Sequence, residues 1–166
     1  MYSAIIDAVV GVLSENQLRA MQGFPESATQ LRAGTLVCVS VKDARSLSSG
    51  MGEYLGRSFD PQGNDKGEIY GLKLEMVIGL DIFAPPGEGH GAAECLEYYG
   101  AISRALSSLP AGLKIKELRC GAAEPDSLTE GYKCPAEIHC VAHIIGEADA
   151  DTGEFLDFNL KGVLRQ

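Results

Sequence analysis

Residues 68–83 read EIYGLKLEMVIGLDIF, and this stretch decides the fold. Its apolar residues fall at every second position: Leu72, Leu74, Met76, Ile78, Leu80 and Ile82. This period of two predicts a β-strand with one face on a hydrophobic core. The opposite phase, from Lys73 to Asp81, is half polar, which favours an antiparallel sheet covered on one side only. A strand of this length would span roughly 50 Å, so we expect a bend or bulge near Gly71 or Gly79.

The other segments supply two helices and further strands around that strand. Helical spacing of apolar residues predicts helices at 3–14 and at about 90–108, and a short helical turn is expected from Pro25 through Leu31. Alternating or β-branched residues predict strands at 35–42, 113–120, 132–145 and 154–164. We therefore expect one α+β domain, 1–166, with a mainly antiparallel sheet of about five strands and two helices packed on one face.

Residues 43–67 interrupt this regular pattern. They hold six glycines or prolines and several serines, so a long arm or loop is expected here. A connection of this length inside a small domain is either functional or partly disordered. It also carries apolar side chains that a solvated linker does not need: Leu47, Met51, Tyr54, Leu55 and Phe59. Two interpretations stay open, a flexible arm that becomes ordered on a partner or a loop folded back on its own domain.

The charge and the N-terminus limit the classes of protein to which the chain can belong. The net charge of −9 weighs against general nucleic-acid binding, which needs clustered Lys and Arg to neutralise phosphates. No apolar run approaches the roughly 20 residues of a membrane helix. Asp7 lies inside the apolar N-terminal stretch with no basic residue before it, so we expect an amphipathic helix there and not a signal peptide.

The cysteines form an odd set with no close pair in the sequence: Cys38, Cys95, Cys120, Cys134 and Cys140. Without an export signal, reduced thiols are the default expectation. Free cysteine packs well as a small buried residue, so we expect thiols in the core.

Several residues suggest chemical sites but lack the geometry for them. His139 and His143 have a zinc-like spacing, yet positions four apart on a strand lie about 13 Å apart, too far for one ion. Cys140 and His139 suggest a nucleophile and its base, but adjacent side chains on a strand point to opposite faces. The glycine-rich residues 87–91 lack the partner residues of a phosphate-binding loop. We therefore expect no catalytic residue, no metal site and no cofactor, while a cysteine paired with His90 stays open.

Several segments, taken together, resemble the tail terminator proteins of long-tailed bacteriophages and related phage-like particles. The resemblance covers roughly residues 1–164. Its segments are the helix ending near Leu13, the Val-rich strand 35–42, the Gly- and Ser-rich stretch 43–67, LEMVIGLDIFAP at 74–85, the helix 91–109 and the closing strands.

The resemblance implies a non-enzymatic structural protein that forms a ring, commonly a hexamer, on the completed tail tube. It implies further copies of the chain, the tail tube and head or neck proteins as partners, and no membrane. It places the protein in the virion tail or neck after synthesis in the host bacterial cytoplasm. DNA would pass through the ring without specific binding, which an acidic lumen would suit and a basic channel would contradict.

We expect the contacts with partners to lie on the arm and on the outer face of the long strand. The candidate residues are Arg45, Met51, Tyr54, Leu55, Arg57, Phe59, Lys73 and Glu75. Other assignments stay open: another phage head–tail connector or minor tail protein, a generic α+β homo-oligomeric binding module, or a small hydrolase using Cys and His.

Overall fold

The computed structural model describes residues 2–25, 30, 33–48, 53–87, 91–109, 112–148 and 155–160. Its elements are α1 (Tyr2–Glu15), β1 (Ala20–Gln22), β2 (Leu36–Ser48), β3 (Tyr54–Phe59), β4 (Asp65–Ala84), α2 (Ala92–Ala105), the 3-10 helix η3 (Leu106–Ser108), β5 (Lys114–Cys120), β6 (Glu124–Asp126), β7 (Gly131–Ala148) and β8 (Phe155–Leu160). This is the expected α+β class. The expected helical turn from Pro25 falls mainly on residues outside the described ranges, as do residues 161–164 of the expected last strand.

The sheet is organised around two long antiparallel strands, β4 and β7. Their register runs from Tyr70 opposite Gly146 to Ala84 opposite Tyr132. β2 and β3 follow one another along the free side of β4, and β6, β5 and β8 do the same along β7. Only β1, beside β2, pairs in parallel among the described strands. The mainly antiparallel sheet is therefore confirmed. It has eight strands and not about five, and the additional strands β1, β3 and β6 are not predicted because they carry no clear sequence pattern.

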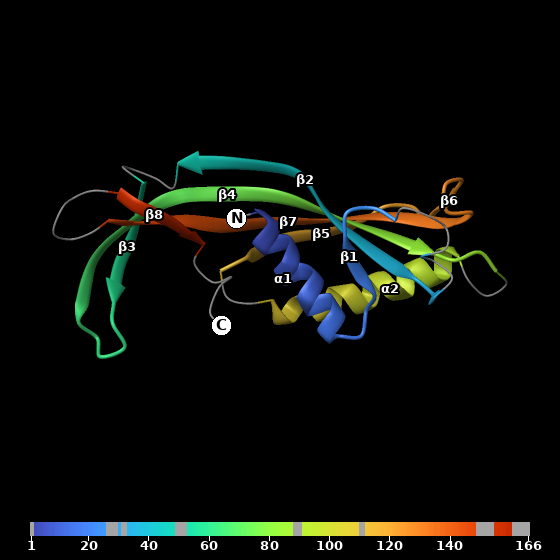
Figure 1. Cartoon of the computed structure of the whole chain (residues 1–166), viewed down its shortest axis with the longest axis horizontal. Helices are drawn as coiled ribbons and strands as arrows, with labels where there is room; N and C mark the ends of the chain where they lie inside the picture. The colour runs from blue at the N-terminus through green and yellow to red at the C-terminus, as the bar shows by residue number, and fades with distance from the viewer. Residues whose placement is uncertain are drawn as a thin grey trace.

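Both helices lie on one face of the sheet, as expected (Figure 1). α1 presents Ile5, Val9 and Leu13 to the core, and α2 presents Ile102. The even-numbered residues of β4 meet them, and those from Leu74 to Ile82 are at most 3% exposed. Burying side chains of this size stabilises the fold by about 1.5–3 kcal/mol each, so this layer is the main source of stability.

The expectation of an irregular arm at 43–67 is wrong in its secondary structure. Residues 43–48 continue β2 along β4, and β3 pairs with the start of β4 as a β-hairpin. Backbone hydrogen bonds between strands do not depend on side-chain type, so a polar, glycine-containing segment can pair beside a strong strand. Residues 49–52, including Met51, lie outside the described ranges.

The hairpin of residues 54–70 projects beyond the two helices, at the left of Figure 1. Asp60 closes its turn, because its carboxylate accepts hydrogen bonds from the backbone N–H groups of Gln62 and Asn64 at 2.9 and 2.8 Å. The register shifts beside Gly56, whose φ of 130° is a backbone conformation that other residues rarely adopt. The hairpin is thus an ordered extension of the sheet, and neither of the described helices α1 and α2 lies over it.

Candidate functional site

The hairpin carries the largest exposed aromatic side chains of β3 and β4. Tyr54, Phe59 and Tyr70 are 45, 60 and 39% exposed. Tyr54 lies directly opposite Tyr70 in the ladder, and their rings meet edge to face with centroids 5.7 Å apart. We call these three residues the hairpin aromatics. Exposed aromatic side chains held on a rigid element are typical of protein–protein contact sites.

The other candidate contact residues of the hairpin have partners within the chain. Arg57 forms an ion pair with Asp65 at 2.8 Å. Leu55 is half-buried and lies over the backbone at Gly71, where it would come within 2.9 Å of an added Cβ. Arg57 and Leu55 therefore make contacts within the hairpin and with the start of β4.

Three further candidates gather on the sheet face that no helix covers. Arg45 lies opposite Glu75 in the β2–β4 ladder, with Nε 3.4 Å from a carboxylate oxygen, and Lys73 donates a hydrogen bond to the same carboxylate. This Lys73 hydrogen bond, followed by the charges of Lys73 and Arg45, lowers the pKa of Glu75. The group borders a shallow hollow of about 260 Å³ that His139 and Lys116 also line. These charges satisfy one another and form a surface separate from the hairpin aromatics.

The phenol of Tyr70 leads to a prediction about pH. Its hydroxyl donates a hydrogen bond to Glu68, and this bond, followed by desolvation and the Glu68 charge, raises the pKa of Tyr70. A group whose pKa is raised on folding contributes stability that is lost as the pH rises through its folded value. We expect Glu68→Gln to lower the Tyr70 pKa, which is followed by the tyrosinate absorbance of the folded protein. The variant should also lose less stability than the unmodified chain at alkaline pH. An unchanged titration in Glu68→Gln would contradict the role of this hydrogen bond.

A buried carboxylate that the sequence did not single out lies on the same uncovered face. The Asp81 side chain is 4% exposed, with Lys133 Nζ 3.1 Å and Lys42 Nζ 3.7 Å from its oxygens. Lys42 is the extra residue of a β-bulge in β2, and its stem crosses Gly79 to reach both Asp81 and Glu137. Gly79 has no side chain and therefore leaves the space that the Lys42 stem fills. The bulge directs the Lys42 side chain into this space, and redirecting a side chain is a known use of a bulge.

The outer face at Asp81 is not the flat, open surface that the alternation predicted. Met21 packs against Leu36, Cys38 and Phe83 on this side of the sheet, and Lys133 Nζ lies 5.4 Å from the Phe83 ring centroid. The short strand β1 brings Met21 here by pairing with β2. The only sequence signal for this small second core is Phe83 in the outward phase of β4.

The thiol nearest to Asp81 is poorly suited to nucleophilic chemistry. Cys38 lies directly opposite Asp81 in the ladder and is 1% exposed. Burial, and then the negative charge of Asp81, raises the Cys38 pKa to about 12. Since the thiolate is the reactive form, Cys38 is almost fully protonated at neutral pH. Cys140 is buried in the main core, whereas His139 is partly exposed and lies beside Glu137, which agrees with their expected separation on opposite faces of β7.

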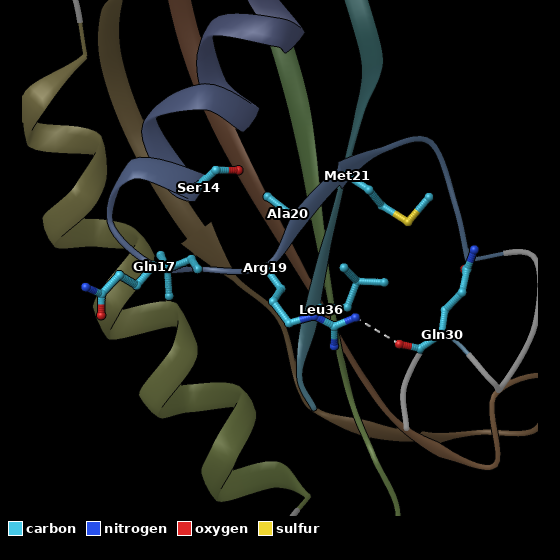
Figure 2. A pocket seen from close by; sticks show the side chains of 8 residues that line it. Ser14, Gln17, Arg19, Ala20, Met21, Gln30 and Leu36 are labelled. Atoms are coloured by element: carbon cyan, nitrogen blue, oxygen red, sulfur yellow. Dashed lines mark hydrogen bonds between the residues drawn. The ribbon is translucent and has the colours of Figure 1, made fainter. Parts of the chain in front are cut away.

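A hollow of about 580 Å³ lies beside the end of α1 (Figure 2). Arg19, which lines this hollow, donates hydrogen bonds to the carbonyl oxygens of Gln30 and Gly34 at 3.1 and 2.7 Å. The backbone N–H of Arg19 also donates to the Tyr98 hydroxyl. The guanidinium thus ties the connection between β1 and β2 to the residue that precedes β1, which is a structural role.

Within the described ranges, no three His, Cys, Asp or Glu side chains are grouped to hold a metal ion. His90, the candidate partner for a cysteine, lies outside those ranges. Neither of the described α-helices is long and apolar enough to cross a membrane. The fold thus defines a mixed α+β protein with a mainly antiparallel sheet, and the chain matches no protein-family model and no curated protein.

Proposed function

We propose that this protein is a structural subunit that assembles with copies of itself into a closed ring at the end of a phage tail tube. The observation that carries the proposal is the β-hairpin with three exposed aromatic residues, which projects past the helical layer (Figure 1). A rigid extension with exposed aromatic side chains fits a contact between subunits better than it fits a site for a small molecule.

The sheet offers two different surfaces for such a contact. β3 lies on the β4 side of the sheet and β5 on the β7 side, and among the described strands neither has a partner on its outer edge. A hairpin of one subunit that pairs with β5 of the next makes a head-to-tail contact, and head-to-tail contacts generate rings when the rotation closes.

Charge also favours a second copy of the chain as the occupant. The exposed edge of β5 carries Lys114, Lys116 and Arg119 against a single acid, Glu117, although the chain as a whole is acidic. The hairpin and the residue before it carry a net negative charge from Glu53, Asp60, Asp65 and Glu68 against Arg57 and Lys66. Opposite charges on the two surfaces favour this pairing and suppress contacts between like surfaces.

The wider role follows from the resemblance of the sequence. The ring would have six subunits, lie in the virion tail or neck after synthesis in the bacterial cytoplasm, and join the tail tube to head or neck proteins. A chain of net charge −9 would let DNA pass without holding it. The protein would have no catalytic role.

The test is assembly of a hairpin variant. We expect the double change Tyr54→Lys and Phe59→Lys to weaken self-association by about 1,000-fold, because two buried aromatic anchors contribute roughly 2 kcal/mol each. Sedimentation velocity across a concentration series gives the mass, and negative-stain microscopy shows whether the particles are rings.

Leu128→Lys is the matched control, because Leu128 is 73% exposed and lies away from the hairpin. It should assemble like the unmodified chain. A protein that stays monomeric at high concentration, or a hairpin variant that assembles normally, would remove the basis of the proposal.

A second candidate function is a homo-oligomeric binding module that pairs through one sheet edge. The unpaired outer edge of β5 among the described strands favours it. This candidate predicts a dimer in the same sedimentation experiment, with no closed ring in the images.

A further inference from the structure

Two cysteines that are separated by 14 positions in the sequence meet at the end of β5. The sulfurs of Cys120 and Cys134 lie 3.3 Å apart. Cys120 is the last residue of β5, and Cys134 lies on β7 two positions before Ala136, the ladder partner of Cys120. A disulfide bond needs a sulfur separation of about 2.05 Å, so the two sulfurs must approach by roughly 1.2 Å for the bond to form.

The backbone around the two thiols holds them in this arrangement. The Gly121 N–H donates to the carbonyl oxygen of Pro135 at 2.7 Å, which fixes the chain leaving β5 against β7. Both thiols also contact the Gly121 carbonyl oxygen, at 3.5 Å for Cys120 and 3.4 Å for Cys134. The pair is therefore positioned by secondary structure and not by a chance approach of two mobile side chains.

The two thiols differ in access to solvent. Cys120 is partly exposed, whereas Cys134 is fully buried in the main core. An oxidant in solution can therefore reach Cys120 first, with Cys134 directly behind it. This is the arrangement of an attacking thiol and a resolving thiol.

We propose that Cys120 and Cys134 form a reversible oxidation site, in which a small disulfide such as glutathione disulfide converts the two thiols into one intramolecular disulfide. The bond would fasten the end of the edge strand β5 to the central strand β7. It would reduce the number of conformations open to the unfolded chain across residues 120–134 and so stabilise the oxidised protein.

The reaction balances in two exchange steps. The Cys120 thiolate attacks one sulfur of the small disulfide, forms a mixed disulfide and releases one small thiolate. The Cys134 sulfur then attacks the Cys120 sulfur, and the second small thiolate leaves and takes up the Cys134 proton. Two protein thiols are oxidised to one disulfide, and one small disulfide is reduced to two small thiols.

The environment of Cys134 predicts how the second step depends on pH. Burial, and then the hydrogen bond with Cys120, raises the Cys134 pKa to about 12. Cys134 is therefore almost fully protonated at neutral pH, as Cys38 is, so closure is the slow step and should become faster as the pH rises toward that value. Cys95 is buried nearby and interacts electrostatically with both thiols. It is therefore the competing disulfide partner, and the test must distinguish a bond from Cys120 to Cys95 from the bond to Cys134.

The test treats the folded, fully reduced chain with the aromatic disulfide DTNB, which releases a coloured thiolate at each exchange. Two coloured thiolates should leave for each Cys120 that reacts. The second should leave more slowly than the first, and its release should be faster at higher pH.

The protein is then quenched in acid, its remaining thiols are alkylated, and it is cut with trypsin and a glutamate-specific protease. Trypsin cuts after Arg119 and Lys133, and the second protease cuts after Glu130 and Glu137, so Cys120 lies on residues 120–130 and Cys134 on residues 134–137, apart from Cys140. Mass spectrometry should show these two peptides joined, and the oxidised chain should have a Tm several degrees higher.

Cys120→Ser, at a partly exposed position, should fold normally and abolish both the cross-link and the rise in Tm. Cys134→Ala should release one coloured thiolate and keep a stable mixed disulfide on Cys120. Cys140→Ser should behave like the unmodified chain. The proposal is overturned if the unmodified chain keeps a mixed disulfide on Cys120 with Cys134 free, if Cys120 is found joined to Cys95, or if Cys120 does not react at all.

Discussion

Replacing Gly71 with alanine is expected to destabilise the protein by ~3 kcal/mol, which corresponds to a fall of roughly 6–12 °C in Tm. A Cβ at Gly71 would lie 2.0 Å from the carbonyl oxygen of Ile144 and 2.9 Å from Cδ1 of Leu55. Gly71 is paired with Ile145 in the central β4–β7 ladder. Because the closest atom belongs to the backbone of β7, the contact can be relieved only by moving one central strand away from the other.

Gly79→Ala is the matched control, since it adds the same methyl group to the same strand. There the new Cβ would meet Lys42 Cε at 2.5 Å, and Lys42 is a flexible side chain that can rotate away. We expect a loss below about 1 kcal/mol. Urea unfolding of both variants gives the comparison, and equal losses would show that the close approach at Gly71 is not what limits the fold.

The periodic parts of the fold could be predicted from the sequence. The alternation from Leu72 to Ile82 correctly predicted a long central strand with one buried face. The bulge expected near Gly71 or Gly79 lies instead in the neighbouring strand β2, between Val41 and Asp43, opposite Ile78 and Val77. Helical spacing found α1 with its buried face, and it found α2, but Leu96, which that spacing places on the buried face of α2, is 56% exposed and Cys95 is buried instead. In β4 and α1 local propensity and tertiary burial agree, so the pattern of apolar residues is sufficient.

The second half of β2 and the hairpin could not be predicted in this way. The bulge at Lys42 shifts the register between Val41 and Asp43, so the alternation that began at Val37 is lost. Downstream, the strand is held mainly by backbone pairing with β4, and its side chains are exposed and polar. Backbone pairing leaves no period in the sequence, and glycines and serines were therefore interpreted as an irregular arm.

The two side-chain clusters on the sheet were also beyond prediction from the sequence, for a different reason. Cys120 meets Cys134, and Asp81 meets Lys133, only because particular registers bring separate strands together. A shift of one residue would send each of these side chains to the other face. A single sequence does not determine those registers, although it does show which residue types are available.

Removing both lysines around Asp81 is expected to cost about 3–5 kcal/mol, because it leaves a buried carboxylate without a compensating charge. Methionine is the suitable replacement for Lys42 and Lys133, since it keeps the apolar stem over Gly79 and over the Phe83 ring while removing the charge. The double variant Lys42→Met/Lys133→Met therefore tests charge more than packing. Its free energy of unfolding is measured by urea titration.

The burial of the three groups predicts an asymmetry between them. The Asp81 side chain is 4% exposed, whereas those of Lys42 and Lys133 are 32 and 35% exposed. When Asp81 is replaced by Asn, the lysine ammonium groups can turn to water. When the lysines are replaced, Asp81 has no route to water. We therefore expect Asp81→Asn alone to destabilise the protein less than the double lysine variant does.

The triple variant decides whether the uncompensated Asp81 charge causes the loss of stability. Adding Asp81→Asn to Lys42→Met/Lys133→Met removes that charge, so it should recover at least half of the lost stability even though it carries one more substitution. Arg104→Met is the control for replacing an exposed cationic side chain as such, because Arg104 is exposed on α2, and it should cost well under about 1 kcal/mol. If the triple variant is less stable than the double variant, the two lysines act by packing over Gly79 and Phe83, and the ion pairs with Asp81 are incidental.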